Sequence, residues 1–95
     1  MGFVLTEAIN SFRESLKVTR REEKPQQWAL IHYNMGNTYL AMAQHADKAQ
    51  SQELLTESIV AYDKALMVYT AREFSSMHEA VNHNRAVAIQ TQRSH

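Results

Sequence analysis

The chain has 95 residues, with ten Lys or Arg, ten Asp or Glu and a formal net charge of zero at neutral pH. This length suffices for one domain over residues 1–95, and the balanced charge argues against nucleic acid, whose partners normally carry a basic stripe. The chain has no cysteine and no run of about 18 apolar residues that could span a bilayer. We therefore expect no membrane partner and a cytoplasmic location.

Two glycines and one proline in the whole chain indicate an all-α fold. The first predicted helix spans residues 3–22, and the second spans residues 25–44, where Pro25 suits the first turn. The face of the first helix that carries its helically spaced apolar residues comprises Leu5, Ala8, Ile9, Phe12, Leu16 and Thr19.

The third predicted helix spans residues 48–72 and the fourth spans residues 76–92. A capping-box pattern, Asp47 with Gln50, opens the third helix, and Ser51 is an alternative cap. A second such pattern, Ser76 with Glu79, opens the fourth helix. The connectors are short, so neighbouring helices should form antiparallel hairpins.

The two halves of the chain repeat each other. The segment LTEAINSFRESLKV at 5–18 aligns without a gap with LTESIVAYDKALMV at 55–68, fifty residues later. The register continues, so that Asn34 matches Asn84 and Gly36 matches Ala86. A duplicated helical hairpin is the simplest explanation.

This alignment gives Gly36 a role inside a helix. A turn with positive φ would not accept alanine cheaply, so the Gly36/Ala86 pair indicates a small-residue position. We expect a second helix to approach closely there, through the small positions Ala8/Ser58 and Ser15/Ala65.

The segments NMGNTY (34–39) and SIVAYDKAL (58–66) resemble the tetratricopeptide repeat family, which carries Asn-Leu-Gly followed by Tyr and then Ala-x-x-x-Tyr-x-x-Ala-Leu. The positions that match are Gly36, Tyr39, Ser58, Tyr62 and Ala65. The period of fifty exceeds the usual length of about 34, and PQQWA (25–29) is similar to a long-repeat variant of the family.

The resemblance implies a TPR-like α-solenoid of about four helices. In that family the first helix of each repeat lines a groove that binds an extended peptide or a partner helix. The positions that this implies here are Tyr33, Asn34, Asn37, Leu40, His83, Asn84 and Val87. Asparagine can both donate to and accept from a peptide backbone, although Asn34 and Asn84 could equally bond neighbouring groups of the chain itself.

The order of the helices leaves both terminal helices without a neighbour on one side. Repeats of this kind bury their faces against one another, so the chain is expected either to be a piece of a longer array or to pair its ends between copies. A head-to-tail contact of the last helix with the first would give rings or filaments, and mutual exchange would give a two-fold dimer. Self-assembly as a homo-oligomer is therefore the alternative function to partner binding.

No pattern in the sequence predicts catalysis, a cofactor or a metal. His78 and His83 are five residues apart, which separates them by about 140° around a helix, so they do not converge as the i and i+4 histidines of a zinc protease do. No Gly-rich phosphate loop or Ser/His/Asp set occurs. We expect a protein-binding module that is not an enzyme.

Overall fold

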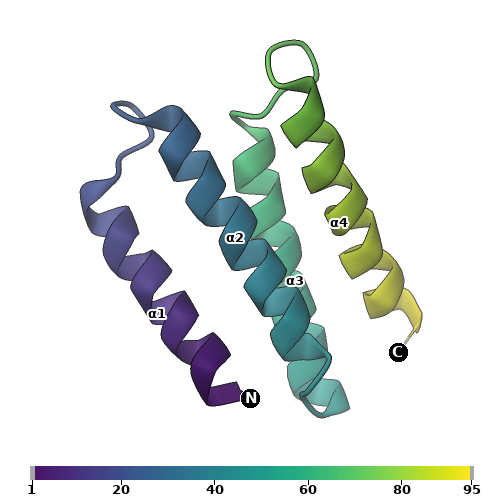
Figure 1. The fold of residues 1–95 in the computed structure, drawn as a ribbon. Helices are drawn as coiled ribbons and strands as arrows, with labels where there is room; N and C mark the ends of the chain where they lie inside the picture. The colour runs from purple at the N-terminus through teal and green to yellow at the C-terminus, as the bar shows by residue number, and fades with distance from the viewer. Residues whose placement is uncertain (1, 95) are drawn as a thin grey trace.

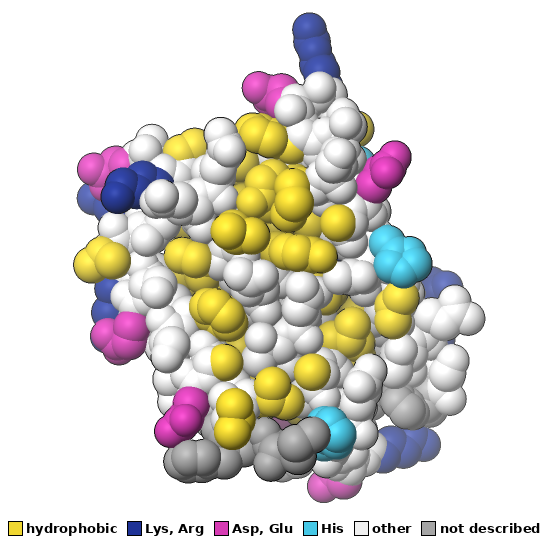
Figure 2. All heavy atoms as spheres, in the orientation of Figure 1, with side chains coloured by type: hydrophobic (Ala, Val, Ile, Leu, Met, Phe, Trp, Pro, Cys, Tyr) yellow, Lys and Arg dark blue, Asp and Glu magenta, His cyan; other side chains and the backbone are white. Residues whose placement is uncertain are grey.

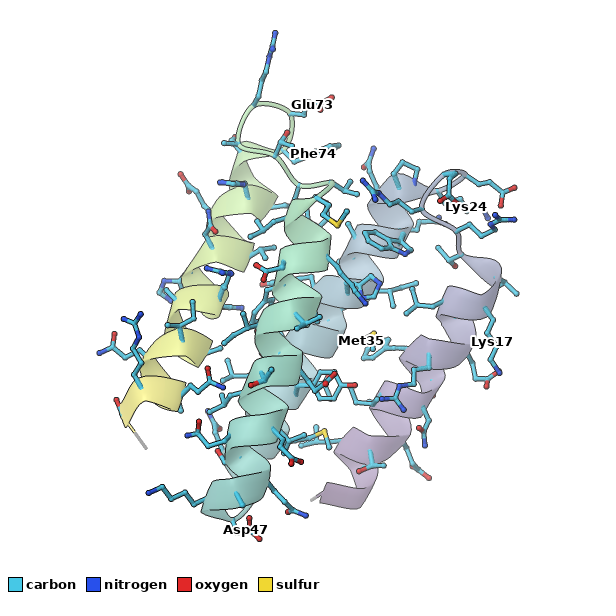
Figure 3. All side chains as sticks on the ribbon, turned by 180° about the vertical axis from the view of Figure 1, so that it is seen from behind. Lys17, Lys24, Met35, Asp47, Glu73 and Phe74 are labelled. Atoms are coloured by element: carbon cyan, nitrogen blue, oxygen red, sulfur yellow. The ribbon has the colours of Figure 1, made fainter. Side chains whose placement is uncertain are left out.

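The computed structural model describes residues 2–94, and their side chains from Val4 onward. Four helices run antiparallel in succession: α1 (Gly2–Val18), α2 (Pro25–Ala43), α3 (Lys48–Leu66) and α4 (Ser75–Ser94). In Figure 1, α2 and α4 lie in front and α3 lies behind them, and Figure 3 shows α3 in front from the opposite side. The predicted all-helical hairpin architecture is confirmed.

Two of the helix starts follow the local chemistry that the sequence predicts. Pro25 occupies the first turn of α2, where its missing N–H leaves no intrahelical bond unmade. Asp47 caps α3, because its Oδ1 accepts a hydrogen bond from the Gln50 backbone N–H at 2.9 Å. Asp47, and not Ser51, is therefore the cap of α3.

Two helices end earlier than predicted, α1 at Val18 instead of residue 22 and α3 at Leu66 instead of residue 72. The residues that follow form separate turns. The Lys24 N–H donates to the Arg20 carbonyl at 2.8 Å, and the Glu73 N–H donates to Thr70 Oγ1 at 3.2 Å. These bonds give the backbone an alternative to helix continuation.

The Ser76 cap is wrong for a related reason. The fourth helix begins at Ser75, and the His78 N–H donates to the Phe74 carbonyl at 2.8 Å. Ser76 therefore lies within the first turn instead of before it.

The connectors before α2 and before α4 share several backbone hydrogen bonds at an offset of fifty residues. The bond from Lys24 N to Arg20 O corresponds to the bond from Phe74 N to Thr70 O, at 2.8 and 2.9 Å. The bonds that enter α2 and α4 are also equivalent: Trp28 N to Lys24 O at 3.0 Å, and His78 N to Phe74 O at 2.8 Å. The duplication seen in the sequence is therefore also present in the backbone.

The core consists of two clusters on either side of α2. One lies between α2, α3 and α4 and contains Leu55, Tyr62 and Val81, each fully buried. The other lies between α1, α2 and α3 and consists of Ile9, Met35, Tyr39 and Ala61.

Gly36 is a point of close contact between α2 and α3. The Ser58 hydroxyl donates to the Gly36 carbonyl at 2.7 Å. A Cβ atom on Gly36 would lie 2.5 Å from Cε1 of the Tyr62 ring. No described residue has positive φ, so the glycine serves close packing and not a turn, as predicted. Its counterpart Ala86 is exposed on α4.

Within the described residues, none of the four helices is both long and apolar enough to cross a membrane.

Candidate partner-binding face

The helices α2 and α4 lie next to each other on the face that Figure 1 presents. Figure 2 shows hydrophobic side chains spread over this face, with the largest group in its upper half. The residues that the family resemblance implies lie on these two helices: Tyr33, Asn34, Asn37 and Leu40 on α2, and His83, Asn84 and Val87 on α4.

A hydrogen-bonded network joins α2 to α4 on this face. The Asn84 side-chain amide donates to the Tyr33 hydroxyl oxygen at 3.2 Å and to Asn37 Oδ1 at 3.0 Å. The structure therefore brings together three of the predicted residues. Asn84 is 51 residues from Tyr33 and 47 residues from Asn37 in the chain.

The network is anchored in the core through α3. The Tyr62 hydroxyl donates to Asn37 Oδ1 at 2.5 Å, and the Tyr62 side chain is fully buried. Burial raises the pKa of Tyr62 to about 12, so the hydroxyl keeps its proton and remains a donor at any physiological pH. Asn37 is thereby held with its carbonyl oxygen toward α3 and α4.

The fixed orientation of Asn37 and Asn84 leaves hydrogen-bonding groups of both side chains unused. Both N–H groups of the Asn84 amide are used within the network. The Asn37 amide nitrogen and the Asn84 side-chain oxygen form no hydrogen bond with the described part of the chain. One donor group and one acceptor are therefore available side by side.

Apolar side chains lie on both sides of the network. Leu30, one turn before Tyr33, is 45% exposed, and Val87, three residues after Asn84, is 39% exposed. Leu30 was not among the residues implied by the resemblance. Its helical spacing of three residues from Tyr33 and seven from Asn37 is the signal that could have identified it.

The remaining predicted residues have different surroundings. Leu40 is half-buried and packs against the core cluster of α2, α3 and α4. His83 and Val87 line a shallow cavity of about 340 Å³ on α4 with Ala86, Gln90 and Thr91. Asn34 is half-buried on α2 and does not join the network of Asn84.

A larger cavity lies elsewhere. It measures about 690 Å³ and is lined by the end of α2, the first half of α3 and Thr6 of α1, with apolar Met42 and Leu54 beside the carboxylates of Glu53 and Glu57. Sequence reasoning did not identify this cavity, because it depends on how three helices meet.

The histidines do not gather into a site. The His78 ring bonds the Tyr69 carbonyl through Nδ1 and the Asn82 amide through Nε2, each at 2.9 Å. Among the residues that the structure describes, no group of three His, Asp or Glu side chains could hold a metal ion.

Compared with known protein families, with functionally characterised proteins and with solved structures, the chain shows no significant match.

Proposed function

We propose that the α2/α4 face binds an extended segment of a partner protein, and that the chain is a non-catalytic interaction module with TPR-like repeats. The observation that carries the proposal is the network of Tyr33, Asn37 and Asn84, which bridges the two helices at 3.0 and 3.2 Å. The fifty-residue repeat of the two hairpins and the motif resemblance support it.

The network suits a peptide backbone as its ligand. Each peptide unit offers one N–H donor and one carbonyl acceptor, and the face offers the Asn84 oxygen and the Asn37 amide in return. Because Asn37 is already held by Tyr62, little side-chain entropy is lost when these groups bind. Bonds to the backbone are tolerant of sequence, so side-chain pockets must supply the specificity.

The flanking apolar residues supply the burial energy. Leu30 and Val87 are 45% and 39% exposed. Complete burial of a side chain of this size contributes about 1.5–3 kcal/mol, so covering the exposed part of each contributes roughly 1 kcal/mol. Side chains about four or more residues apart on an extended segment reach both Leu30 and Val87 while the backbone between them meets the network.

The test begins with a library of random peptides displayed on phage and selected on the immobilised protein. Enriched peptides are synthesised, and their affinity is measured by fluorescence anisotropy for the wild type and for Leu30→Ser and Val87→Ser. Val60→Ser is the matched control, because Val60 is 43% exposed but lies on α3. Neither Asn37→Ala nor Tyr33→Ala is a clean probe, because each removes a partner from the network.

We expect Leu30→Ser and Val87→Ser each to weaken binding by about tenfold, which corresponds to about 1.4 kcal/mol. Val60→Ser should bind like the wild type, and all three variants should keep the wild-type melting temperature within a few degrees. Selected peptides that bind all three variants equally would contradict the proposal, as would a selection that enriches no peptide.

A further inference from the structure

One half of α1 carries no charge, and only its edge packs on the cluster with α2, through Ile9, Phe12 and Leu16. At about 100° per residue, the uncharged residues cover about half of the helix circumference. They comprise Val4, Leu5, Ala8, Ile9, Ser11, Phe12, Ser15, Leu16 and Val18, while Glu7, Arg13, Glu14 and Lys17 occupy the other half. The described side chains of α1 are buried only at Ile9, and Val4 and Val18 are 66% and 79% exposed. We call the uncharged half of α1 the α1 face.

The second copy of this face shows what covers it. The α3 counterparts of Leu5, Ala8, Phe12 and Ser15 are Leu55, Ser58, Tyr62 and Ala65, and each of the four is fully buried. Two of them contact α2 directly, since Ser58 bonds the Gly36 carbonyl and Tyr62 bonds Asn37. In α1 the equivalent positions are half-buried or exposed, because no described helix precedes α1 as α2 precedes α3 (Figure 1).

One asparagine of α2 has a side chain without a hydrogen bond to the described residues. Asn84 on α4 donates to Tyr33 and Asn37 of the preceding equivalent helix, α2. Its counterpart Asn34 on α2 is half-buried, and its side chain makes no hydrogen bond with the described residues. A helix placed before α1 as α2 is placed before α3 would bring the same kind of partners to Asn34.

We propose that the α1 face docks an amphipathic helix from outside these 95 residues, similar in pattern to α2. Such a helix has a small residue opposite Phe12, as Gly36 lies opposite Tyr62. It has a tyrosine and an asparagine four residues apart opposite Asn34, as Tyr33 and Asn37 lie opposite Asn84. The surface is distinct from the α2/α4 face and does not depend on it.

The outer face of α4 in a second copy fits this position poorly. The buried α2 residues Ala29, Met35 and Ala43 are replaced on α4 by Glu79, Arg85 and Arg93. Burying these charges against Phe12 and Leu5 without new partners would be costly. Arg85 is also already paired with Asp63 on α3, at 2.6 Å.

Ala86 adds a steric obstacle. It stands where α2 has Gly36, and a Cβ at Gly36 would lie 2.5 Å from the Tyr62 ring. The ring of Phe12 would meet the Ala86 methyl group in the same way. The two ends of the molecule are therefore not complementary, which favours a partner helix over head-to-tail self-assembly.

The test uses a fluorescein-labelled peptide with the sequence of residues 24–46, which carries the full α2 pattern. Its binding is measured by anisotropy to the intact wild-type protein and to Ser15→Arg, a substitution at an exposed position of the α1 face. Ala86→Arg is the matched control on the outer face of α4, also at an exposed position. A second peptide with Gly36→Val tests the close approach, and light scattering gives the mass of the protein without peptide.

We expect saturable binding that Ser15→Arg weakens by about tenfold or more and that Ala86→Arg leaves unchanged. The Gly36→Val peptide should bind more weakly, and Val87→Ser should have no effect, which separates this surface from the α2/α4 face. The absence of saturable binding would overturn the proposal. Binding that Ser15→Arg does not weaken would also overturn it, because the peptide would then be replacing the chain's own α2. A dimer of the free protein that Ser15→Arg dissociates would also overturn it, because the occupant would then be a second copy.

Discussion

At the scale of single residues, the contact between Gly36 and Tyr62 determines how closely α2 and α3 pack. The Tyr62 ring is fully buried and tied to Asn37, so it cannot rotate away freely from an added methyl group. Helix propensity and packing therefore oppose each other at this position. Alanine is favoured over glycine by about 1 kcal/mol in a helix, whereas overpacking a core costs about 1–3 kcal/mol.

We expect Gly36→Ala to lower the free energy of unfolding, because a Cβ 2.5 Å from a ring carbon exceeds what small shifts relieve. The packing cost less the propensity gain gives a net loss of up to about 2 kcal/mol, measured by urea denaturation. The reverse exchange, Ala86→Gly, should cost only the propensity difference of about 1 kcal/mol, because Ala86 is exposed. A Gly36→Ala variant as stable as the wild type would show that Tyr62 can move.

The buried histidine of α2 makes stability depend on pH. Burial, and secondarily the charge of Lys64, lowers the pKa of His32 to about 4 from 6.5. The unfolded chain therefore binds a proton between pH 6.5 and 4 that the folded chain does not bind, so this contribution to stability is complete above pH 6.5 and declines as pH falls toward 4.

We predict that the free energy of unfolding falls by about 2 kcal/mol between pH 7 and pH 5 through His32 alone. Urea denaturation of the wild type and of His32→Gln at pH 7, 6 and 5 measures it. The free energy of unfolding of the variant should depend much less on pH. An equal pH dependence in the two proteins would exclude His32 as its origin.

At the scale of helices, local sequence determines where a helix begins better than where it ends. Pro25 and Asp47 were identified correctly because a missing N–H and a capping carboxylate act within one turn. The early ends at Val18 and Leu66 were missed because the residues that follow are compatible with helix. Their separate turns depend on bonds such as Glu73 N–H to Thr70 Oγ1 and on the packing of the hairpin.

The two candidate caps of α3 give a matched pair of variants. Asp47→Ala should destabilise the protein by about 1 kcal/mol, because the Gln50 N–H loses its 2.9 Å bond. Ser51→Ala should be neutral or slightly stabilising, because Ser51 Oγ is buried with no hydrogen-bond partner. Thermal melts of both variants test this, and the opposite order of stability would make Ser51 the working cap.

The four helices are not equally protected. The described side chains of α1 are buried only at Ile9, whereas α3 contributes six buried residues to its packing against its neighbours. Native-state hydrogen exchange should therefore show the lowest protection in α1 and the highest in α2 and α3. Equal protection along the chain would contradict this prediction. Selective protection of α1 when the peptide of residues 24–46 is added would support docking on the α1 face.

At the scale of the whole molecule, the family resemblance and the repeat together named the three residues of the network before the structure did. The fifty-residue alignment places Asn34 and Asn84 at equivalent positions, and the structure brings Asn84 to Tyr33 and Asn37. The sequence could not show that Tyr62 of α3 holds Asn37 in place. This contact depends on the depth of packing at Gly36, which no local pattern encodes.

The repeat also explains why its two copies now differ. Gly36 has no side chain where α3 covers it, whereas Ala86 is exposed where the described chain places no further helix. The residue at each of the two equivalent positions therefore suits the packing around it. The α2/α4 face lies between α1 and the outer side of α4, which differ in their residues. The proposed function needs only that face, which both copies form together.

The central claim, that the α2/α4 face receives a partner segment, is tested most directly by titrating the ¹⁵N-labelled protein with a selected peptide and mapping the shift changes by NMR. The account predicts that the largest changes occur at Leu30, the side-chain amides of Asn37 and Asn84, and Val87, with little change on α1. Changes concentrated instead around the cavity of Leu54 and Glu57, or along the α1 face, would contradict it.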